Sequence, residues 1–199
     1  MSGAAPSDEE LVACLRGGGV VLVPTDTVYG LAVQPGNADA IERLFKLKNR
    51  PPERQLPVIV ASAQHVAALG VTISRAAQKL LHSPFVPGAL TIAFGFGEGV
   101  RPAWLDGRDE VAVRIPNHAR MLAILRGAGP LLVTSANAHG QQTPSETAAI
   151  LAQLHGAPDL VIEGGTIGVV PSTLVNCRRE PPAIEREGVV TRTMLEPYL

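Results

Sequence analysis

The sequence predicts an α/β domain, a twisted mixed β-sheet with flanking helices. Short apolar runs rich in β-branched residues, such as residues 20–23, alternate along the chain with segments of helical periodicity. The chain also contains 20 glycines and 17 prolines, many of which stand between these runs as turn residues. With 199 residues, of which 46% are hydrophobic, we expect residues 1–199 to form a single domain with a full core.

The first half of the chain is expected to form four helices and two buried strands. Ser7 opens a capping-box pattern, and a run of glycines ends the helix that follows it. Asn37 is placed to cap a second helix, which should end near Lys48 because a proline follows at position 51. The expected elements are helices at residues 7–17, 37–48, 62–69 and 74–81, and strands at residues 20–23 and 56–61.

The second half continues the alternation of strands and helices. Residues 143–146 read Thr-Pro-Ser-Glu, a second capping-box pattern with proline at the first helical position. They predict a helix that starts at Thr143 and runs to about residue 154. The other expected elements are an amphipathic helix at residues 117–126 and strands at residues 90–94, 111–115, 131–134, 160–162, 172–176 and 183–186.

The composition excludes several classes of protein. There are 17 Lys and Arg against 18 Asp and Glu, so a broad basic surface for nucleic acid is not expected, while a local basic groove stays open. Two cysteines make a poor disulfide framework, and the chain shows neither a signal peptide nor an apolar stretch of ~20 residues. We therefore expect a soluble, cytoplasmic protein that does not engage a membrane.

Familiar nucleotide-binding and metal-binding patterns do not occur. No lysine is followed by Ser or Thr, as a Walker A loop requires, and the glycines at positions 95, 97 and 99 lack the dinucleotide spacing. The five histidines are scattered, so we expect no protein-built metal site. The polar segments offer no evident nucleophile, which indicates chemistry performed by positioning the substrates.

Lys48 and Arg50 are the first candidates for binding an anion. The following proline favours an extended backbone, in which side chains two positions apart point the same way, so both cations would converge on one phosphate chain. Lysine offers phosphate a point charge and arginine a planar fork. The competing interpretation is a solvated basic surface, which is the commoner meaning of such a run.

Polar residues also follow two of the predicted strands. Residues 24–31 read Pro-Thr-Asp-Thr-Val-Tyr-Gly-Leu and come directly after the strand at residues 20–23. Ligands collect at the carboxyl ends of strands in open α/β sheets, so the two threonines (Thr25 and Thr27), Asp26 and Tyr29 are placed to hold a small polar ligand. A turn whose hydroxyls bond to the backbone fits the same residues equally well. Ser135 and Asn137 follow the strand at residues 131–134 in the same way.

Three further residues complete the candidates. Thr143 is first of all a helix cap, and the free N–H groups of the helix that it starts favour an anion nearby. Arg114 ends a strand just before a proline, where its guanidinium can clamp a carboxylate or form an edge salt bridge. Ser172 stands after a proline, either as a ligand-binding hydroxyl or simply as the first residue of a strand.

Six ordered segments carry a resemblance to a known family. They are residues 24–31, Lys48-x-Arg50-Pro51, residues 87–91 (Pro-Gly-Ala-Leu-Thr), 113–116 (Val-Arg-Ile-Pro), 134–137 (Thr-Ser-Ala-Asn) and 171–173 (Pro-Ser-Thr). In this order they resemble the YrdC family of threonylcarbamoyl-AMP synthases. The resemblance extends from about residue 11 to residue 188, and the ordered set is far more specific than any one segment.

The resemblance implies a fold and an activity. The family's fold is YrdC-like, an α/β sheet twisted around a concave, positively lined groove. Its reaction joins L-threonine, bicarbonate and ATP into threonylcarbamoyl-adenylate and pyrophosphate, and the product feeds a separate tRNA threonylcarbamoyl transferase complex that modifies the adenosine beside the anticodon. We expect Mg²⁺ with ATP, held largely by phosphates and water.

The resemblance also assigns the candidate residues to substrates. Lys48 and Arg50 would be catalytic, since they would neutralise charge on the phosphates during transfer. The residues expected to bind ATP are Lys48, Arg50, Ser135 and Asn137, to which the helix-start argument adds Thr143. The residues expected to hold L-threonine are Thr27, Tyr29, Arg114 and Ser172.

The sequence departs from the family in several places. Val86 and Ala89 stand where many relatives have Trp and Pro, and Arg54 stands where relatives vary among Lys, Asn and His. Residues 50–55 are rich in proline and are candidates for a lid over the site. We expect the short single-domain type, without the C-terminal domain of longer relatives.

The rival interpretation is an RNA-binding or ribosome-associated paralogue of the same fold without synthase activity. The net charge of −1 and an aromatic content of 4% weaken RNA binding beyond a weak contact. The presence of both Lys48-x-Arg50 and Ser135-x-Asn137 weighs against a lost activity. A related domain occurs in hydrogenase-maturation carbamoyltransferases, but those chains are much longer.

Overall fold

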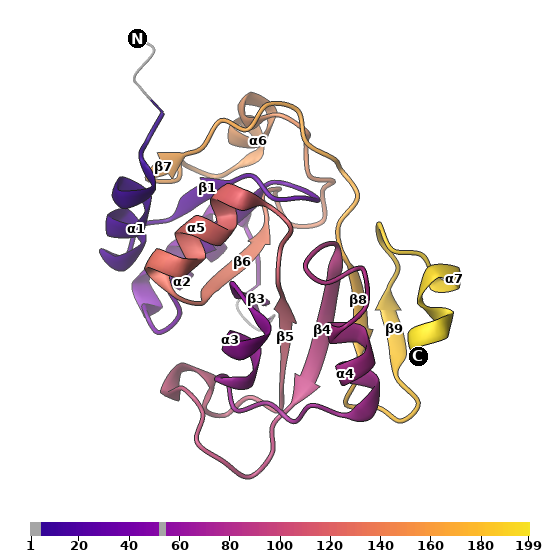
Figure 1. Ribbon diagram of the computed structural model, residues 1–199. Coiled ribbons are helices and arrows are strands. Elements are labelled where there is room, and N and C mark those ends of the chain that lie inside the picture. Colours follow the sequence, from indigo (N-terminus) through magenta and orange to yellow (C-terminus); the bar gives the residue numbers. More distant parts are fainter. Residues whose placement is uncertain (1–4, 52–54) are drawn as a thin grey trace.

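Nine strands form one mixed sheet in the computed structural model, which describes residues 5–51 and 55–199 (Figure 1). The strand order is β7-β1-β2-β6-β3-β5-β4-β8-β9, with parallel pairs β7–β1, β3–β5 and β4–β8. The strands are β1 (Val21–Val23), β2 (Gly30–Val33), β3 (Val58–Ile59), β4 (Leu90–Gly95), β5 (Glu110–Arg114), β6 (Leu131–Ser135), β7 (Leu160–Val161), β8 (Thr173–Asn176) and β9 (Ala183–Arg186). The predicted α/β class with a mixed sheet is confirmed.

Helices accompany this sheet in the order that the sequence predicts. They are α1 (Asp8–Arg16), α2 (Ala38–Lys48), α3 (Ala63–Ala67), α4 (Arg75–Leu81), α5 (Ala119–Ala128), α6 (Thr147–Gln153) and α7 (Arg192–Leu195), with 3₁₀ turns η1 (Ala103–Leu105) and η2 (Glu196–Tyr198). The sequence did not predict η1, η2 or α7, which lies beside β9 (Figure 1). No helix among the described residues is long and apolar enough to cross a membrane.

Local capping signals set the ends of the first two helices. The Ser7 hydroxyl accepts a hydrogen bond from the Glu10 N–H, and the Glu10 carboxylate accepts one from the Ser7 N–H at 2.7 Å, so the predicted capping box is present. Asn37 caps α2, since its Oδ1 accepts the N–H of Ala40 at 3.0 Å. Both helices begin where the sequence places them.

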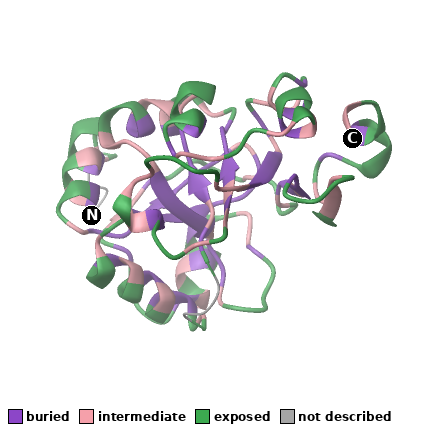
Figure 2. Ribbon diagram, turned by 90° about the horizontal axis from the view of Figure 1, so that it is seen from below, coloured by how far each residue is buried: buried purple, intermediate pink, exposed green. Residues whose placement is uncertain are grey.

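The two faces of the sheet carry two separate cores. Val21 and Val23 of β1 pack on one face with residues of α1 and α5, while Leu22 packs on the other face with residues of α2. Side chains alternate between faces along a strand, so this division confirms the prediction of a strand covered on both sides. The central strands are buried, β7 and β9 at the edges of the sheet are partly exposed, and the outer sides of the helices are exposed (Figure 2).

β2 is a strand that the sequence did not predict. The chain turns at residues 24–29 and returns as β2, antiparallel to β1, with Gly30 opposite Val23. β2 then pairs with β6, where Gly30 lies opposite Ser135. The polar turn at residues 24–29 is therefore fixed between strands, and the segment at residues 135–137 lies beside it.

Thr143 does not cap a helix, so the capping box predicted at residues 143–146 is wrong. α6 begins at Thr147, and its N-cap, Glu146, makes no side-chain capping bond. The Thr143 hydroxyl instead donates to Oδ1 of Asn137 at 2.9 Å. The hydroxyl that would cap a helix is thus bonded to Asn137 from another part of the loop. Because no helix begins at Thr143, free helical N–H groups give no reason to expect an anion beside it.

Candidate active site

A cavity of about 500 Å³ lies on one face of the sheet. Glu110, Ala112 and Arg114 of β5 line it, and their alternate spacing places all three side chains on the same face. Arg114 is in register with Ile59 of β3 and with Thr91 of β4, so the floor continues across neighbouring strands. Ile59 also belongs to the core beneath α1 and α5. The cavity thus occupies the part of that face beside these two helices.

The cavity gathers most of the residues that the sequence singled out. Eight of the nine predicted site residues line it: Thr27, Tyr29, Arg50, Arg114, Ser135, Asn137, Thr143 and Ser172. These residues come from segments 145 positions apart at the extremes, from residue 27 to residue 172. Lys48 is the predicted residue that does not reach the cavity surface. The lid predicted at residues 50–55 lies largely outside the described residues, as does Arg54.

Lys48 is buried behind the cavity wall, with 2% of its surface exposed. Its ammonium group donates to the main-chain oxygens of Ser135 and Asn137, the latter at 2.6 Å. The Lys48 oxygen in turn accepts the N–H of His139 at 2.7 Å. Burial, and then the charge of Arg50, lowers the pKa of Lys48 to about 7.

The chain between Lys48 and Arg50 is not extended as the sequence predicts. Lys48 is the last residue of α2, and Asn49 follows in the left-handed conformation with φ of 49°. This ending is common for helices and needs no side-chain strain at asparagine. The turn sends the two cations in different directions, Lys48 inward and Arg50 to the cavity, where Arg50 donates to Thr134 Oγ1 at 3.1 Å.

The segment after β6 folds around Asn137. Its side-chain amide donates to the main-chain oxygens of Ala138 and Gln141 at 2.8 and 2.7 Å, and its Oδ1 accepts from Thr143. Asn137 therefore stabilises the loop at residues 137–143 with all of its polar atoms. Ser135 and Thr143 lie on the same wall of the cavity as this loop.

The turn at residues 24–29 forms a further border of the cavity, beside the segment that follows β6. The Tyr29 hydroxyl accepts the N–H of Gly164 and donates to the oxygen of Gly165, both at 2.8 Å. Tyr29 thus holds the strap at residues 163–171, which connects β7 with β8. Gly168 approaches the turn so closely that a Cβ there would lie 2.8 Å from the Thr27 oxygen. The strap contributes Val169 and Pro171 to the cavity lining.

Arg114 and Ser172 both line the cavity, and each is held by a threonine hydroxyl. The Ser172 hydroxyl lies 2.7 Å from Thr91 Oγ1, and the Arg114 guanidinium reaches Thr27 Oγ1 at 2.7 Å. Arg186 of β9 is a residue that sequence reasoning missed: it lines the cavity and donates to the Ser172 oxygen at 2.8 Å. Burial, and then the charge of Arg114, lowers the pKa of Arg186. The sequence indicated this position only through the two expected strands at residues 172–176 and 183–186, which pair as β8 and β9.

The cavity is positive. Its charged lining residues are Arg50, Arg114 and Arg186 against Glu110, which pairs with Arg178 at 2.9 Å. Leu56, Ile59 and other apolar side chains supply the rest of the floor. Converging guanidinium and hydroxyl groups over an apolar floor suit a ligand with carboxylate or phosphate groups.

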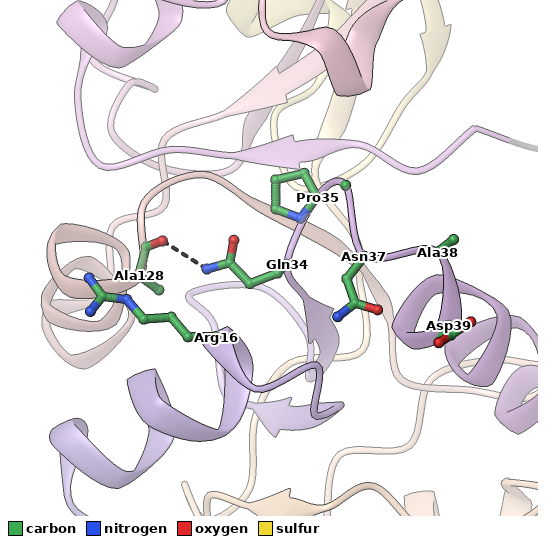
Figure 3. A pocket seen from close by; sticks show the side chains of 8 residues that line it. Arg16, Gln34, Pro35, Asn37, Ala38, Asp39 and Ala128 are labelled. Atoms are coloured by element: carbon green, nitrogen blue, oxygen red, sulfur yellow. Dashed lines mark hydrogen bonds between the residues drawn. The ribbon is translucent and has the colours of Figure 1, made fainter.

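A second hollow, of about 570 Å³, lies at the other end of β2 (Figure 3). Arg16, Gln34, Asn37 and Asp39 are among the eight residues that line it, and Gln34 already donates to the Ala128 oxygen at 2.8 Å. No residue predicted for the site lies there. The predicted site residues therefore gather in the cavity over β5 and not in this second hollow.

Together the fold and the cavity define a small α/β protein whose site gathers arginines, hydroxyls and main-chain groups of the kind that suit anionic ligands. The chain belongs to the Sua5/YciO/YrdC family. The family model, described as "Telomere recombination", matches residues 13–188. Structure and sequence agree on this assignment.

Individual members of this family are similar to the chain over most of its length. The chain is 32% identical to a threonylcarbamoyl-AMP synthase of Bacillus subtilis over 96% of its own length and 56% of that protein. It is 35% identical to a threonylcarbamoyl-AMP synthase of Thiobacillus denitrificans, over 87% of this chain and 91% of the relative. The crystal structure of Pyrococcus abyssi Sua5 complexed with L-threonine matches with a TM-score of 0.86 and 30% identity, over 97% of this chain and 58% of that one. The chain thus spans little more than half of the longer relatives.

Proposed function

We propose that the protein is a threonylcarbamoyl-AMP synthase, a nucleotidyltransferase that forms threonylcarbamoyl-adenylate and pyrophosphate from L-threonine, bicarbonate and ATP. One observation carries the proposal: seven residues predicted from separate motifs line a single cavity. Relatives with this printed activity match the chain over most of its length, including one of similar size. The activity would support the threonylcarbamoyladenosine modification of tRNA next to the anticodon.

The chemistry requires positioning rather than a protein nucleophile. The amine of threonine condenses with bicarbonate to give a carbamate and water. A carbamate oxygen then attacks the α-phosphorus of ATP, and the bond to pyrophosphate breaks. Alignment of two reactants is worth up to ~7–11 kcal/mol in favourable cases, so a cavity that holds both is sufficient to explain catalysis. The strap at residues 163–171 and the apolar floor would limit the water that reaches the labile carbamate.

The phosphate end of the site would be formed by Arg50, Ser135 and Thr143. Arg50 supplies a cation on the cavity surface, where it would stabilise charge on the phosphates as the bond to pyrophosphate breaks. Lys48 and Asn137 shape the same wall from behind, through the main-chain groups of residues 135–143. In this proposal Lys48 does not touch the ligand and acts through the main-chain groups of Ser135 and Asn137.

The threonine end would be formed by Thr27, Arg114 and Ser172. Arg114 would bind the substrate carboxylate, since a guanidinium is the best-matched partner for that group. The hydroxyls of Thr27 and Ser172 belong to residues that line the same cavity, and they would receive the polar groups of the amino acid. Tyr29 would support this end by holding the strap.

Mg²⁺ would enter with ATP. The described residues contain no group of three or more His, Cys, Asp or Glu side chains placed to hold a metal ion, and Glu110 is the acidic side chain of the cavity lining. These residues fit an ion held mainly by phosphates and water, which is how Mg²⁺ usually binds beside nucleotides. When bound, the ion would neutralise phosphate charge.

The proposal extends to the protein's setting. We place the enzyme in the cytoplasm, as a single domain over residues 1–199, delivering its product to a tRNA threonylcarbamoyl transferase complex. Two free cysteines, Cys14 and Cys177, are compatible with a reducing compartment. The common sheet that joins all nine strands supports one domain.

Pyrophosphate release from ATP, with threonine and bicarbonate omitted in turn, tests the proposal. We expect release only when all three substrates are present, together with a threonylcarbamoyl-adenylate product identified by mass. ATP hydrolysis that is indifferent to threonine would overturn the proposal. Retention of tRNA on a filter at low and high salt, without pyrophosphate release, would favour the RNA-binding alternative.

A further inference from the structure

Asp26 and Arg114 form the most buried ion pair among the described residues. Arg114 NH2 donates to Asp26 Oδ1 at 2.7 Å, and the two side chains are 8% and 15% exposed. In each of the other five pairs both side chains are at least 29% exposed. Removing one partner of a buried pair leaves an uncompensated charge, so the state of Arg114 depends on Asp26.

The turn that carries Asp26 is itself tightly organised. The Thr25 hydroxyl donates to the Val28 oxygen at 2.6 Å and accepts the N–H groups of Thr27 and Val28 at 3.2 and 3.3 Å. These bonds fix the backbone on both sides of Asp26. The carboxylate is therefore presented from a rigid turn.

The guanidinium of Arg114 is held from three directions. Its Nε donates to the Gly88 oxygen at 2.9 Å, NH1 donates to Thr27 Oγ1, and NH2 donates to Asp26. A guanidinium has five N–H groups, so one remains on each terminal nitrogen for a ligand. Three fixed donors determine the plane of the group and the direction of the remaining two.

Asp26 acts from behind the guanidinium. Arg114 lines the cavity, whereas Asp26 does not. A second guanidinium lies near, since the charge of Arg114, after burial, lowers the pKa of Arg186. Burial lowers the pKa of Arg114, and Asp26 opposes that change. The carboxylate thus offsets the repulsion between two arginines without occupying the space of a ligand.

We propose that Asp26 is a positioning residue, which holds the Arg114 guanidinium so that its two remaining N–H groups receive the carboxylate of the amino-acid substrate. This inference rests on the proposed function. Asp26 would not touch the substrate, and its whole effect would pass through Arg114. Consequently its loss should weaken threonine binding and leave the ATP end of the cavity unaffected.

The first test is the kinetics of Asp26→Asn, which keeps the shape of the side chain and removes its charge. We expect the KM for threonine to rise about 10- to 100-fold, as for a lost hydrogen bond to a charged group, while the KM for ATP stays near its original value. The matched control is Asp159→Asn, which removes the partner of Arg43 at the protein surface. Equal increases in both KM values, or an unchanged threonine KM, would overturn the proposal.

An analogue separates positioning from general damage. L-Threoninol lacks the carboxylate. The proposal therefore predicts that this competitor inhibits Asp26→Asn and the original protein with the same inhibition constant, although the two proteins differ in their KM for L-threonine. A merely structural role for Asp26 would weaken both ligands together. That result would contradict the inference even if the threonine KM had risen as expected.

A double-mutant cycle covers the case in which Asp26→Asn folds poorly because Arg114 loses its partner. The double variant Asp26→Asn/Arg114→Gln removes both charges. We expect it to match Arg114→Gln alone in its threonine KM, since Asp26 would have nothing left to position. An additional loss of the same size as in the single variant would overturn the proposal. If the original protein releases pyrophosphate without threonine, the proposed function fails instead.

Discussion

The ammonium nitrogen of Lys48 lies 2.6 Å from the main-chain oxygen of Asn137, inside the protein and behind the cavity wall. The same group donates to the main-chain oxygen of Ser135. The end of α2 is thereby tied to the segment that follows β6, and two motifs far apart in the sequence form one structural unit. A cation placed in this way stabilises a loop of main-chain carbonyl groups, which is a role distinct from direct contact with phosphate.

Lys48 should make the stability of the protein depend on pH. Burial lowers its pKa in the folded state from 10.5 to about 7, so between these values the unfolded chain binds more protons than the folded one. Stability contributed by this residue therefore rises with pH across that window, by up to about 1.4 kcal/mol per unit. In urea unfolding at pH 7, 8 and 9, the free energy of unfolding of the original protein should increase relative to that of Lys48→Met as the pH rises.

Lys46→Met is the matched control for this measurement. Lys46 lies on the same helix but is exposed, in an i,i+4 pair with Glu42. Its replacement should shift stability by an amount that does not vary with pH between 7 and 9. A difference between the original protein and Lys48→Met that stays constant over the same range would contradict the assignment of the pH dependence to Lys48.

The helix caps at Ser7 and Asn37 were predictable because their partners lie three residues away. The same reasoning failed at Thr143, where the pattern was present but Asn137 offered the hydroxyl a better partner in space. β2 was missed because its four residues directly follow a polar turn, and only pairing with β1 and β6 makes them a strand. Local sequence patterns therefore predicted the elements that local contacts stabilise.

The site follows the same division. Seven residues of the cavity were identified from the ordered motifs, although the directions in which their side chains point were not. The left-handed conformation of Asn49 turns the side chains of Lys48 and Arg50 in different directions. The effect of Pro51 on the backbone of Arg50, on which the expectation was based, says nothing about the conformation of Asn49. Arg186 was missed because its position depends on the β8–β9 hairpin. The pairing of Asp26 with Arg114 was missed because the two residues lie 88 positions apart.

Arg50 should be essential for turnover. It supplies a guanidinium on the cavity surface, and its loss removes charge stabilisation where the bond to pyrophosphate breaks. We expect Arg50→Ala to reduce pyrophosphate release roughly 100- to 1,000-fold, with a thermal unfolding transition still present. Arg43→Ala, which removes a surface guanidinium paired with Asp159, is the control and should retain activity. Near-normal turnover in Arg50→Ala would remove this residue from the catalytic site.

Arg114 should determine the requirement for threonine. Its guanidinium is buried at the floor of the cavity with two N–H groups left for a carboxylate. Arg114→Lys keeps a positive charge but loses the planar fork, and we expect at least about a 10-fold higher KM for threonine with little change for ATP. Steady-state pyrophosphate release at varied concentrations of each substrate measures both values. An unchanged threonine KM in this variant would exclude the carboxylate clamp.

Tyr29 should hold the strap at residues 163–171 even before any substrate binds. Its hydroxyl satisfies the N–H of Gly164 and the oxygen of Gly165, so Tyr29→Phe leaves two main-chain groups without this partner, at a cost of about 1–3 kcal/mol. We expect faster hydrogen exchange at residues 164–168 in the ligand-free protein and, since the strap borders the cavity, a higher KM for threonine. Tyr198→Phe, at a ring packed on Phe85 near the C-terminal end, is the control. If Tyr29→Phe raises the KM while exchange in the strap stays unchanged, the hydroxyl contacts threonine directly, and the strap does not depend on it.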